Sequence, residues 1–132
     1  MKLSTKSRYG TRVLIDLAEH YNEGPVRTSF IAERQEISVK YLEQIIVPLK
    51  KANLIKSIRG PKGGHMLARP PEEIRMGEVL EVLEEGMDIA GCINNPDTCK
   101  RAVRCKSRDL WEMANAAIYD KLNTLKLSEI IK

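Results

Sequence analysis

The sequence predicts a mostly α-helical fold with a small β wing, in which a winged helix-turn-helix domain is followed by a long C-terminal helix. Two amphipathic helical patterns joined by a short turn precede a hairpin pattern with a glycine-rich tip. An apolar stripe with helical spacing then runs through residues 106–125. Together these patterns indicate one compact domain with one projecting element.

The composition is that of an ordinary globular chain. It has 132 residues, of which 42% are hydrophobic and 30% are charged, and a formal net charge of +4. A chain of this length can bury a core without disulfides or metal ions as staples. The sequence begins without an apolar signal core and has no run of about eighteen apolar residues, so we expect a cytoplasmic protein that is neither secreted nor membrane-spanning.

The first predicted helix covers residues 6–21. Its inner face is marked by an apolar stripe with helical spacing, and the chain from Asn22 to Pro25 contains the residues that stop it. The stripe consists of Val13, Leu14, Leu17 and Ala18.

A short second helix is predicted at residues 29–35. Thr28 or Ser29 is expected to cap its N-terminus, because a hydroxyl can accept from the free backbone N–H groups there. Phe30 and Ile31 are expected to face the core.

A third helix is predicted from Ser38, a good N-cap, to about residue 52. Asn53 readily takes the left-handed conformation that ends a helix. Pro48 lies inside this helix, and its ring collides with the carbonyl of Gln44, so we expect a kink.

The remainder of the chain is predicted to form a hairpin, a short helix, a polar loop and a long helix. The strands are expected at residues 54–59 and 65–68, the turn at 60–64, the short helix at 76–84, the loop at 86–105 and the long helix at 106–125. The corresponding domains are a winged helix-turn-helix DNA-binding domain (1–85), a cysteine-bearing loop (86–105) and a dimerisation helix with its tail (106–132).

The charge pattern favours a nucleic-acid partner on the hairpin side. Residues 50–64 contain five Lys or Arg and no acid, whereas residues 72–88 contain seven acids and one Arg. Such a distribution makes one face cationic, which suits a phosphate backbone.

The third helix and the hairpin tip carry residue types that read DNA. Lys40, Glu43 and Gln44 suit guanine, cytosine and adenine edges in a major groove. Tip glycines allow close backbone approach, and Arg59 and Lys62 can reach phosphates or a minor groove. A solvated charged helix beside a surface hairpin would give the same pattern, and the residues alone leave that alternative open.

Three cysteines, Cys92, Cys99 and Cys105, lie within fourteen positions. Their odd number argues against a secreted disulfide scaffold. Thiolates are the usual ligands of iron–sulfur clusters, and the basic residues around them are expected to favour the thiolate form. A thiol redox switch and a zinc site, which normally takes four Cys or His ligands, are the alternatives.

Short motifs are spread along essentially the whole chain. They are SRYG (7–10), IAERQ (31–35), IS (37–38), YLEQ (41–44), RGPKGG (59–64), GEV (77–79) and LSEI (127–130). With the three clustered cysteines, their joint pattern resembles the iron–sulfur cluster regulator family of winged helix-turn-helix transcription factors, typified by IscR.

The resemblance implies a homodimer, crossed through the last helix, that binds a pseudo-palindromic operator in double-stranded DNA. The apolar stripe of that helix also favours dimerisation, because it exceeds what so small a domain can cover; packing on the chain's own core is the alternative. The expected DNA-binding residues are Lys6, Tyr9, Ser38, Lys40, Tyr41, Glu43, Gln44, Arg59, Gly60, Lys62 and Gly63.

The resemblance also implies an iron–sulfur cluster on Cys92, Cys99 and Cys105. Relatives with a two-iron cluster have a His three residues after the last Cys, where this chain has Arg108, and nitric-oxide-sensing relatives use an acidic residue at the position of Arg8. Neither arginine can ligate, so the fourth ligand is unknown, and both a two-iron and a four-iron cluster stay open. The two histidines of the chain are expected to be structural or solvent-facing.

We therefore expect a homodimeric regulator that senses iron–sulfur cluster status and controls iron–sulfur biogenesis or a related stress response. The alternative is a regulator of the same fold that senses thiol oxidation, nitric oxide or a metabolite of cysteine metabolism without a stable cluster. An enzyme is not expected, because the chain has no C-x-x-C pair and no phosphate-binding glycine loop before a helix.

Overall fold

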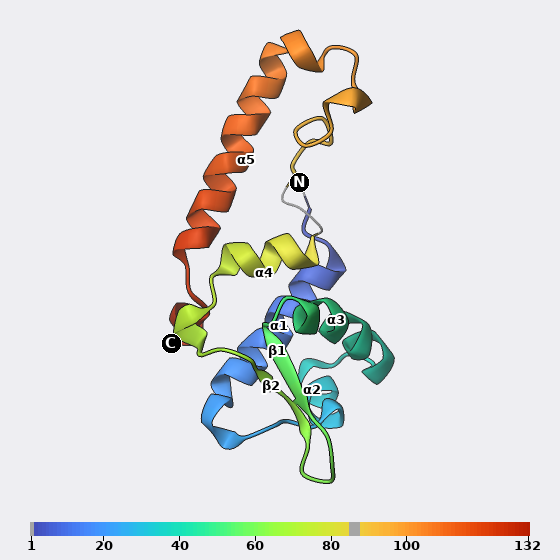
Figure 1. Cartoon of the computed structure of the whole chain (residues 1–132), viewed down its shortest axis with the longest axis vertical. Coiled ribbons are helices and arrows are strands. Elements are labelled where there is room, and N and C mark those ends of the chain that lie inside the picture. Colours follow the sequence, from blue (N-terminus) through green and yellow to red (C-terminus); the bar gives the residue numbers. More distant parts are fainter. Residues whose placement is uncertain (1, 85–87) are drawn as a thin grey trace.

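Helices and one hairpin form the body of the molecule in the computed structural model, which describes residues 2–84 and 88–132. A long helix and the cysteine loop project together from one end of this body (Figure 1). The elements are α1 (Thr5–Glu19), α2 (Thr28–Gln35), α3 (Val39–Lys51), β1 (Ile55–Ile58), β2 (Gly64–Leu67), α4 (Met76–Leu83), α5 (Lys106–Thr124) and α6 (Leu127–Ile130). The predicted fold class, mostly helical with a small β wing, is confirmed.

Helix α1 begins at a hydroxyl cap and ends earlier than predicted. The Ser4 side chain accepts a hydrogen bond from the Ser7 backbone N–H at 3.0 Å. The helix stops at Glu19, because the chain tightens into a 3-10 turn over Tyr21–Glu23 before Gly24, whose φ is 80°.

Helix α2 differs from the prediction in its cap and in one inward residue. Arg27, in extended conformation, is the N-cap and contributes no side-chain cap bond. Thr28 lies inside the first turn, so the expected cap by Thr28 or Ser29 is wrong. Phe30 is 51% exposed, because the buried face of this short helix is built by Ile31 and the residue that follows it.

Helix α3 follows the prediction at both ends. The Ser38 hydroxyl accepts from the Tyr41 backbone N–H at 3.1 Å, and Asn53 takes φ 60°. Glu36 also has a positive φ, 55°, which turns the chain between α2 and α3. Pro48 lies inside α3 as predicted, and the expected kink there stays a prediction.

Strands β1 and β2 pair antiparallel in the predicted hairpin, with Ile55 opposite Leu67 and Ile58 opposite Gly64. The sequence did not reveal a further bridge between Val26 and His65. Each residue donates its backbone N–H to the carbonyl of the other at 2.8 Å. The segment before α2 is therefore fixed to the outer side of the hairpin.

The C-terminal tail returns to the body after α5. The Met76 N–H donates to the Leu125 carbonyl at 2.8 Å, and the Leu127 N–H donates to the Ile74 carbonyl at 2.9 Å. Leu127, the first residue of the unpredicted helix α6, is fully buried in the core. The predicted domain division stays a prediction, and its first boundary, at residues 85 and 86, lies outside the described residues.

No helix in the described part of the chain combines the length and the hydropathy needed to cross a membrane.

A buried carboxylate joins α1 to α2. Asp16, 3% exposed, accepts from Arg34 Nε at 2.9 Å and Nη2 at 2.6 Å, and from Gln35 Nε2 at 3.0 Å. Burial raises the pKa of Asp16, but the hydrogen bonds from Arg34 and Gln35 outweigh it and hold the pKa below its ordinary value. The ionised form of Asp16 therefore stabilises the folded state.

We expect Asp16→Asn to lower the free energy of unfolding by about 2 kcal/mol near neutral pH. The loss is smaller than for a fully buried ion pair, because the Arg34 side chain is partly exposed. The folded-state pKa lies below the ordinary 3.8, so the contribution of Asp16 is complete above that value and is lost as the pH falls through the folded-state pKa. Urea unfolding of the parent protein should thus lose stability in acid more steeply than the variant. Glu33→Gln, an exposed change on α2, is the control, and equal acid slopes in parent and Asp16→Asn would contradict the prediction.

Candidate functional site

Helix α3 presents the predicted base-reading side chains to solvent. Lys40, Glu43 and Gln44 are all exposed. The opposite face is buried in the core through Leu42, Ile45, Ile46 and Leu49. Val47, which no sequence pattern marked, is 51% exposed one turn further along the polar face. This arrangement leaves one continuous face of α3 free to enter a groove.

The aromatic residues predicted to contact DNA also contact one another. The rings of Tyr9 on α1 and Tyr41 on α3 meet edge to face with centroids 5.9 Å apart, and the Arg12 guanidinium lies 5.0 Å from the Tyr9 centroid. Both tyrosines are half-buried, as is Lys6 in the first turn of α1. The pair brings the start of α1 beside the recognition face of α3.

The hairpin tip exposes two cations on a tight turn. Arg59, Gly60 and Lys62 are exposed, whereas Gly63 is buried. The Gly63 N–H donates to the Gly60 carbonyl at 2.9 Å, and a Cβ on Gly63 would collide with the Ile58 carbonyl oxygen. Gly63 therefore builds the turn with its N–H already bonded, while the neighbouring side chains are free to reach a phosphate.

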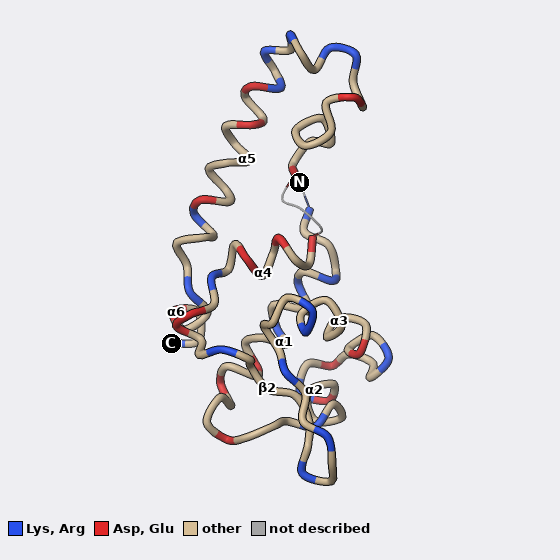
Figure 2. The backbone as a smooth tube through the Cα atoms, viewed as in Figure 1, with Lys and Arg blue, Asp and Glu red and all other residues tan. Residues whose placement is uncertain are grey.

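Cations gather at the wing tip, and carboxylates follow α4. Figure 2 shows Lys and Arg at the hairpin tip and on α3, and Asp and Glu along α4. A phosphate backbone is attracted to the cations of the wing tip and repelled by the carboxylates of α4.

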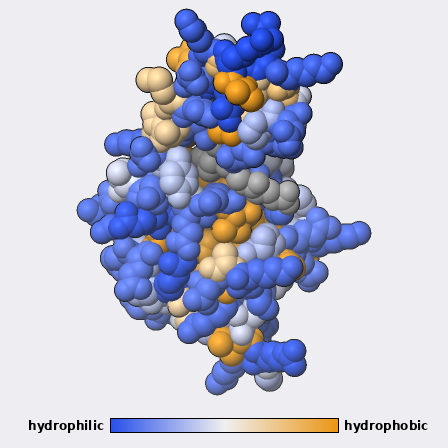
Figure 3. All heavy atoms as spheres, turned by 45° about the horizontal axis from the view of Figure 1, so that its top comes forward, coloured by the Kyte–Doolittle hydropathy of each residue, from blue (hydrophilic) through white to orange (hydrophobic). Residues whose placement is uncertain are grey.

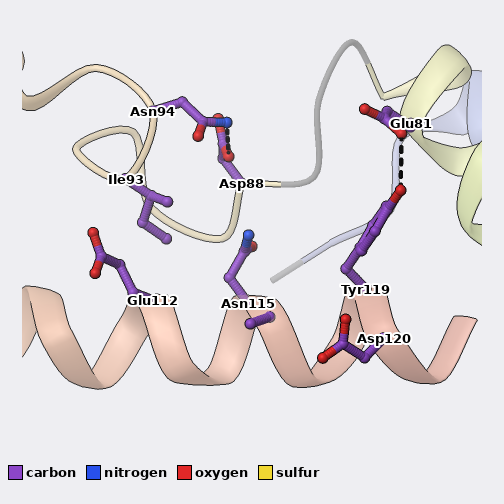
Figure 4. A pocket seen from close by; sticks show the side chains of 9 residues that line it. Glu81, Asp88, Ile93, Asn94, Glu112, Asn115, Tyr119 and Asp120 are labelled. Atoms are coloured by element: carbon purple, nitrogen blue, oxygen red, sulfur yellow. Dashed lines mark hydrogen bonds between the residues drawn. The ribbon is translucent and has the colours of Figure 1, made fainter. Parts of the chain in front are cut away.

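A cavity of about 480 Å³ lies between the cysteine loop, α4 and α5 (Figure 4). Four carboxylates line it: Glu81, Asp88, Glu112 and Asp120. Tyr119 bridges its rim by donating to Glu81 at 3.2 Å. This concentration of negative charge excludes the cavity as a phosphate-binding site.

The three cysteines are free thiols on the projecting loop. Cys99 is exposed, and Cys92 and Cys105 are half-buried. Cys105 is the N-cap residue of α5. Hydrogen bonding from the Arg108 backbone lowers the pKa of the Cys105 thiol, with smaller contributions from Ser107 and the nearby Arg101 charge. Cys105 is thus suited to the thiolate form that ligates metals.

The donor chemistry of the cysteine loop fits an iron–sulfur cluster. Thiolates are the ordinary ligands of such clusters, and the helix N-terminus and basic residues of the loop offset their charge. Within residues 2–84 and 88–132, no three His, Cys, Asp or Glu side chains lie close enough together to hold a metal ion. The described residues thus supply the thiol donors without a preformed site for a single metal ion.

Arg108 ties the loop to α5, a role that its place in the sequence did not reveal. Its Nε donates to the Cys92 carbonyl at 2.9 Å and its Nη2 to the Ile93 carbonyl at 3.0 Å. Its Nη1 lies 3.0 Å from Glu112 Oε1, one turn further along α5. A second bond supports this attachment, since Asn115 accepts from the Ile89 N–H at 2.9 Å. The guanidinium thereby fixes the Cys92 segment against the helix that Cys105 begins.

Both histidines lie in the body and have bonded rings. His20 Nδ1 lies 2.8 Å from the Asp16 carbonyl oxygen. The His65 ring lies between two hydroxyls, with Nδ1 2.8 Å from Ser57 Oγ and Nε2 2.9 Å from Thr28 Oγ1. Neither residue is on the cysteine loop or on α5.

Helix α5 has no buried residue and exposes large apolar side chains. Leu110 is 53% exposed, Trp111 is 42% exposed and Met113 is 71% exposed. Figure 3, with the loop end of the molecule brought forward, shows apolar residues emerging between hydrophilic ones there. The chain's own core therefore leaves the start of the predicted stripe uncovered at Leu110 and Met113, whereas Leu125 at its other end packs against the core.

Known proteins resemble the chain over its whole length. A family model described as Rrf2, iron-dependent transcriptional regulator, matches residues 3–132. Protein rrf2 of Nitratidesulfovibrio vulgaris is 46% identical over 132 residues, covering 100% of this chain and 88% of that protein. IscR of T. potens superposes with a TM-score of 0.81 at 37% identity, over 99% of this chain and 86% of that one. CymR, described as the global cysteine regulator of B. subtilis, superposes with a TM-score of 0.82 at 34% identity, over 99% and 96%.

We expect Arg108→Ala to loosen the cysteine loop, because it removes both side-chain bonds to the Cys92 and Ile93 carbonyls. Hydrogen exchange of the amides in residues 88–95 should accelerate several-fold, while the amides of α1 and α3 keep their protection. Arg104→Ala, which removes an exposed arginine from the same loop, is the control. Unchanged exchange in Arg108→Ala would show that the two bonds do not hold the loop.

Proposed function

The chain belongs to the Rrf2 family of transcriptional regulators, and from that premise we propose that it is a homodimeric DNA-binding regulator that senses iron–sulfur cluster status. Membership of this family rests on the match over residues 3–132 and makes it a regulator rather than an enzyme. The observation that carries the DNA-binding part is the exposed polar face of α3 beside the cationic hairpin tip. We also propose that this DNA-binding regulator is cytoplasmic.

Two elements of each subunit contact the duplex in this proposal. The exposed face of α3 enters a major groove, where Lys40, Glu43 and Gln44 meet base edges. Arg59 and Lys62 at the wing tip neutralise phosphates beside that groove. Lys6 and Tyr9, at the start of α1 beside α3, contact the sugar–phosphate backbone of the DNA.

Dimerisation through α5 places two such units on one pseudo-palindromic site. The exposed apolar residues of α5, Leu110, Trp111 and Met113, supply the surface that a second copy covers. Two-fold symmetry then matches the protein to two half-sites about one helical turn apart.

The sensing part of the proposal rests on Cys92, Cys99 and Cys105. They are the three free thiols of one loop, and IscR, a solved relative, shares the fold over nearly the whole chain. A bound iron–sulfur cluster would be gained, lost or damaged as the levels of iron, oxygen or nitric oxide change. Arg108 attaches the Cys92 segment to α5 and Cys105 is the N-cap residue of α5, so a change at the cysteines is passed directly to the proposed dimer helix. We propose that the regulator controls iron–sulfur biogenesis or a related stress response.

A second candidate is a thiol-oxidation or cysteine-metabolite sensor without a stable cluster. It is favoured by the likeness to CymR, described as a global cysteine regulator, and by the exposure of Cys99 to oxidants. A colourless protein that refuses reconstitution but loses DNA affinity after peroxide treatment would favour this candidate over the cluster sensor.

For DNA binding, we expect Arg59→Ala with Lys62→Ala to weaken affinity for a duplex that the parent protein enriches from random-sequence DNA. The negative slope of log affinity against log salt should become shallower by about 0.9 for each phosphate that the wing no longer neutralises. We expect about two such phosphates per subunit. Fluorescence anisotropy at several salt concentrations measures both quantities. Lys100→Ala with Lys132→Ala removes the same charge elsewhere, and an equal effect of the two pairs would contradict a specific role of the wing.

For assembly, we expect Leu110→Glu with Met113→Glu to convert a dimer into monomers, because two charges would be buried in the α5 interface. Sedimentation velocity measures the mass, and circular dichroism confirms that the body stays folded. Val103→Glu is the control, since Val103 is 97% exposed on the loop and lies outside the stripe. A parent protein that sediments as a monomer would overturn the dimer.

For the cluster, we expect protein purified without oxygen to show visible charge-transfer absorption and stoichiometric iron and sulfide. The iron count separates a two-iron from a four-iron cluster. Serine at Cys92, Cys99 and Cys105 together should abolish the absorption, because hydroxyls are poor ligands for such iron. A coloured triple variant with the iron content of the parent would place the cluster elsewhere.

A further inference from the structure

His65 connects the wing to the helix-turn-helix. It lies on β2 opposite Ser57 of β1, and its backbone makes the two 2.8 Å bonds with Val26. Its half-buried ring extends between β1 and α2, with Nδ1 2.8 Å from Ser57 Oγ and Nε2 2.9 Å from Thr28 Oγ1. Thr28 is the first residue of α2, so one side chain joins three elements.

Either neutral form of the His65 ring satisfies this arrangement. A neutral imidazole has one donor and one acceptor, and a hydroxyl can take either role. Burial and the positive charge of Lys50 lower the pKa of His65, against a smaller opposing influence of Glu43. The ring is therefore neutral near physiological pH, and both its nitrogens are used in hydrogen bonds.

The bond to Thr28 differs in consequence from the bond to Ser57. Ser57 belongs to the same hairpin as His65, so their bond stiffens the wing internally. Thr28 belongs to the helix-turn-helix, so its bond fixes the direction in which the wing leaves the body. Arg27, the residue before Thr28, also donates to the wing, from its Nη2 to the Pro61 carbonyl at 2.9 Å. This bond is exposed to water and is therefore weaker than the Thr28 bond.

We propose that His65 is a positioning residue for DNA recognition, which through Thr28 sets the angle of the wing relative to α3. In this role it does not contact DNA. It holds Arg59 and Lys62 where they can reach phosphates while α3 occupies the groove. The inference rests on the proposed DNA-binding function and adds to it a specific geometric determinant.

Two substitutions of His65 separate its two bonds. The amide of Gln extends to about the position of Nε2 and can still bond Thr28, whereas the shorter Asn reaches only the position of Nδ1 and Ser57. Thr28→Val removes the Thr28 hydroxyl with little change of volume, and Ser57→Ala removes the Ser57 hydroxyl. We thus expect His65→Gln and Ser57→Ala to bind like the parent protein, and His65→Asn and Thr28→Val to bind more weakly.

The probe is the duplex that the parent protein enriches from random-sequence DNA, and affinity is measured at several salt concentrations. His65→Asn and Thr28→Val should bind about 5-fold more weakly and show a lower salt slope, because the wing no longer reaches its phosphates. Adding Arg59→Ala and Lys62→Ala to Thr28→Val should cost little more, since the wing tip is already displaced. A change that merely reduced stability would lower affinity without this non-additivity.

Parent-like affinity and salt slope in Thr28→Val and His65→Asn would overturn the proposal, as would fully additive effects with the wing-tip variant. Hydrogen exchange of the Val26 and His65 amides, which join the segment before α2 to the wing, provides a readout without DNA. Thr28→Val should accelerate it more than Ser57→Ala, because only the Thr28 bond connects the wing to α2. If the parent protein itself binds no DNA, the proposed function fails and the role of His65 in DNA recognition fails with it. The exchange measurement then still decides whether His65 holds the wing.

Discussion

The burial of one face of α3 is the constraint on which the rest of the structure depends. Leu42, Ile45, Ile46 and Leu49 lie in the core, and each buried aliphatic side chain contributes about 1.5–3 kcal/mol. Rotating α3 would expose them, so the opposite face with Lys40 and Gln44 has to point to solvent. The same packing places the N-terminus of α1 beside α3, where the Tyr9 ring meets the Tyr41 ring. The recognition surface is thus a consequence of how the core is filled.

The projecting part of the molecule, α5 with the cysteine loop, is held together differently from the body. Helix α5 has no buried residue, and its interactions with the cysteine loop include the polar Arg108 bonds to two carbonyls and the Asn115 bond to Ile89. Polar interactions of this kind can be exchanged at low cost, whereas a packed core cannot. A loop held in this way is suited to respond to a ligand, while the body that reads DNA keeps its shape.

Sequence patterns predicted the elements whose signals are local. Helical periodicity located α1, α3, α4 and α5, and capping and turn chemistry located Ser38, Asn53 and the hairpin tip. What the patterns missed depends on interactions between distant residues: the bridge of Val26 with His65, the α6 helix with buried Leu127, and the Arg108 bonds to the loop. Phe30 was misassigned for the same reason, because the buried side of a two-turn helix is decided by its neighbours.

The state of the cysteine loop should change DNA affinity, and linkage tests this central claim most directly. Affinity for the enriched duplex should be measured for anaerobically purified protein before and after its iron is removed by chelation. We expect a change of about 5- to 150-fold between the two states, typical of coupled sites, and no change when Cys92, Cys99 and Cys105 are all serine. Identical affinity of the parent protein in both states would contradict the claim and leave a DNA-binding regulator whose signal acts elsewhere.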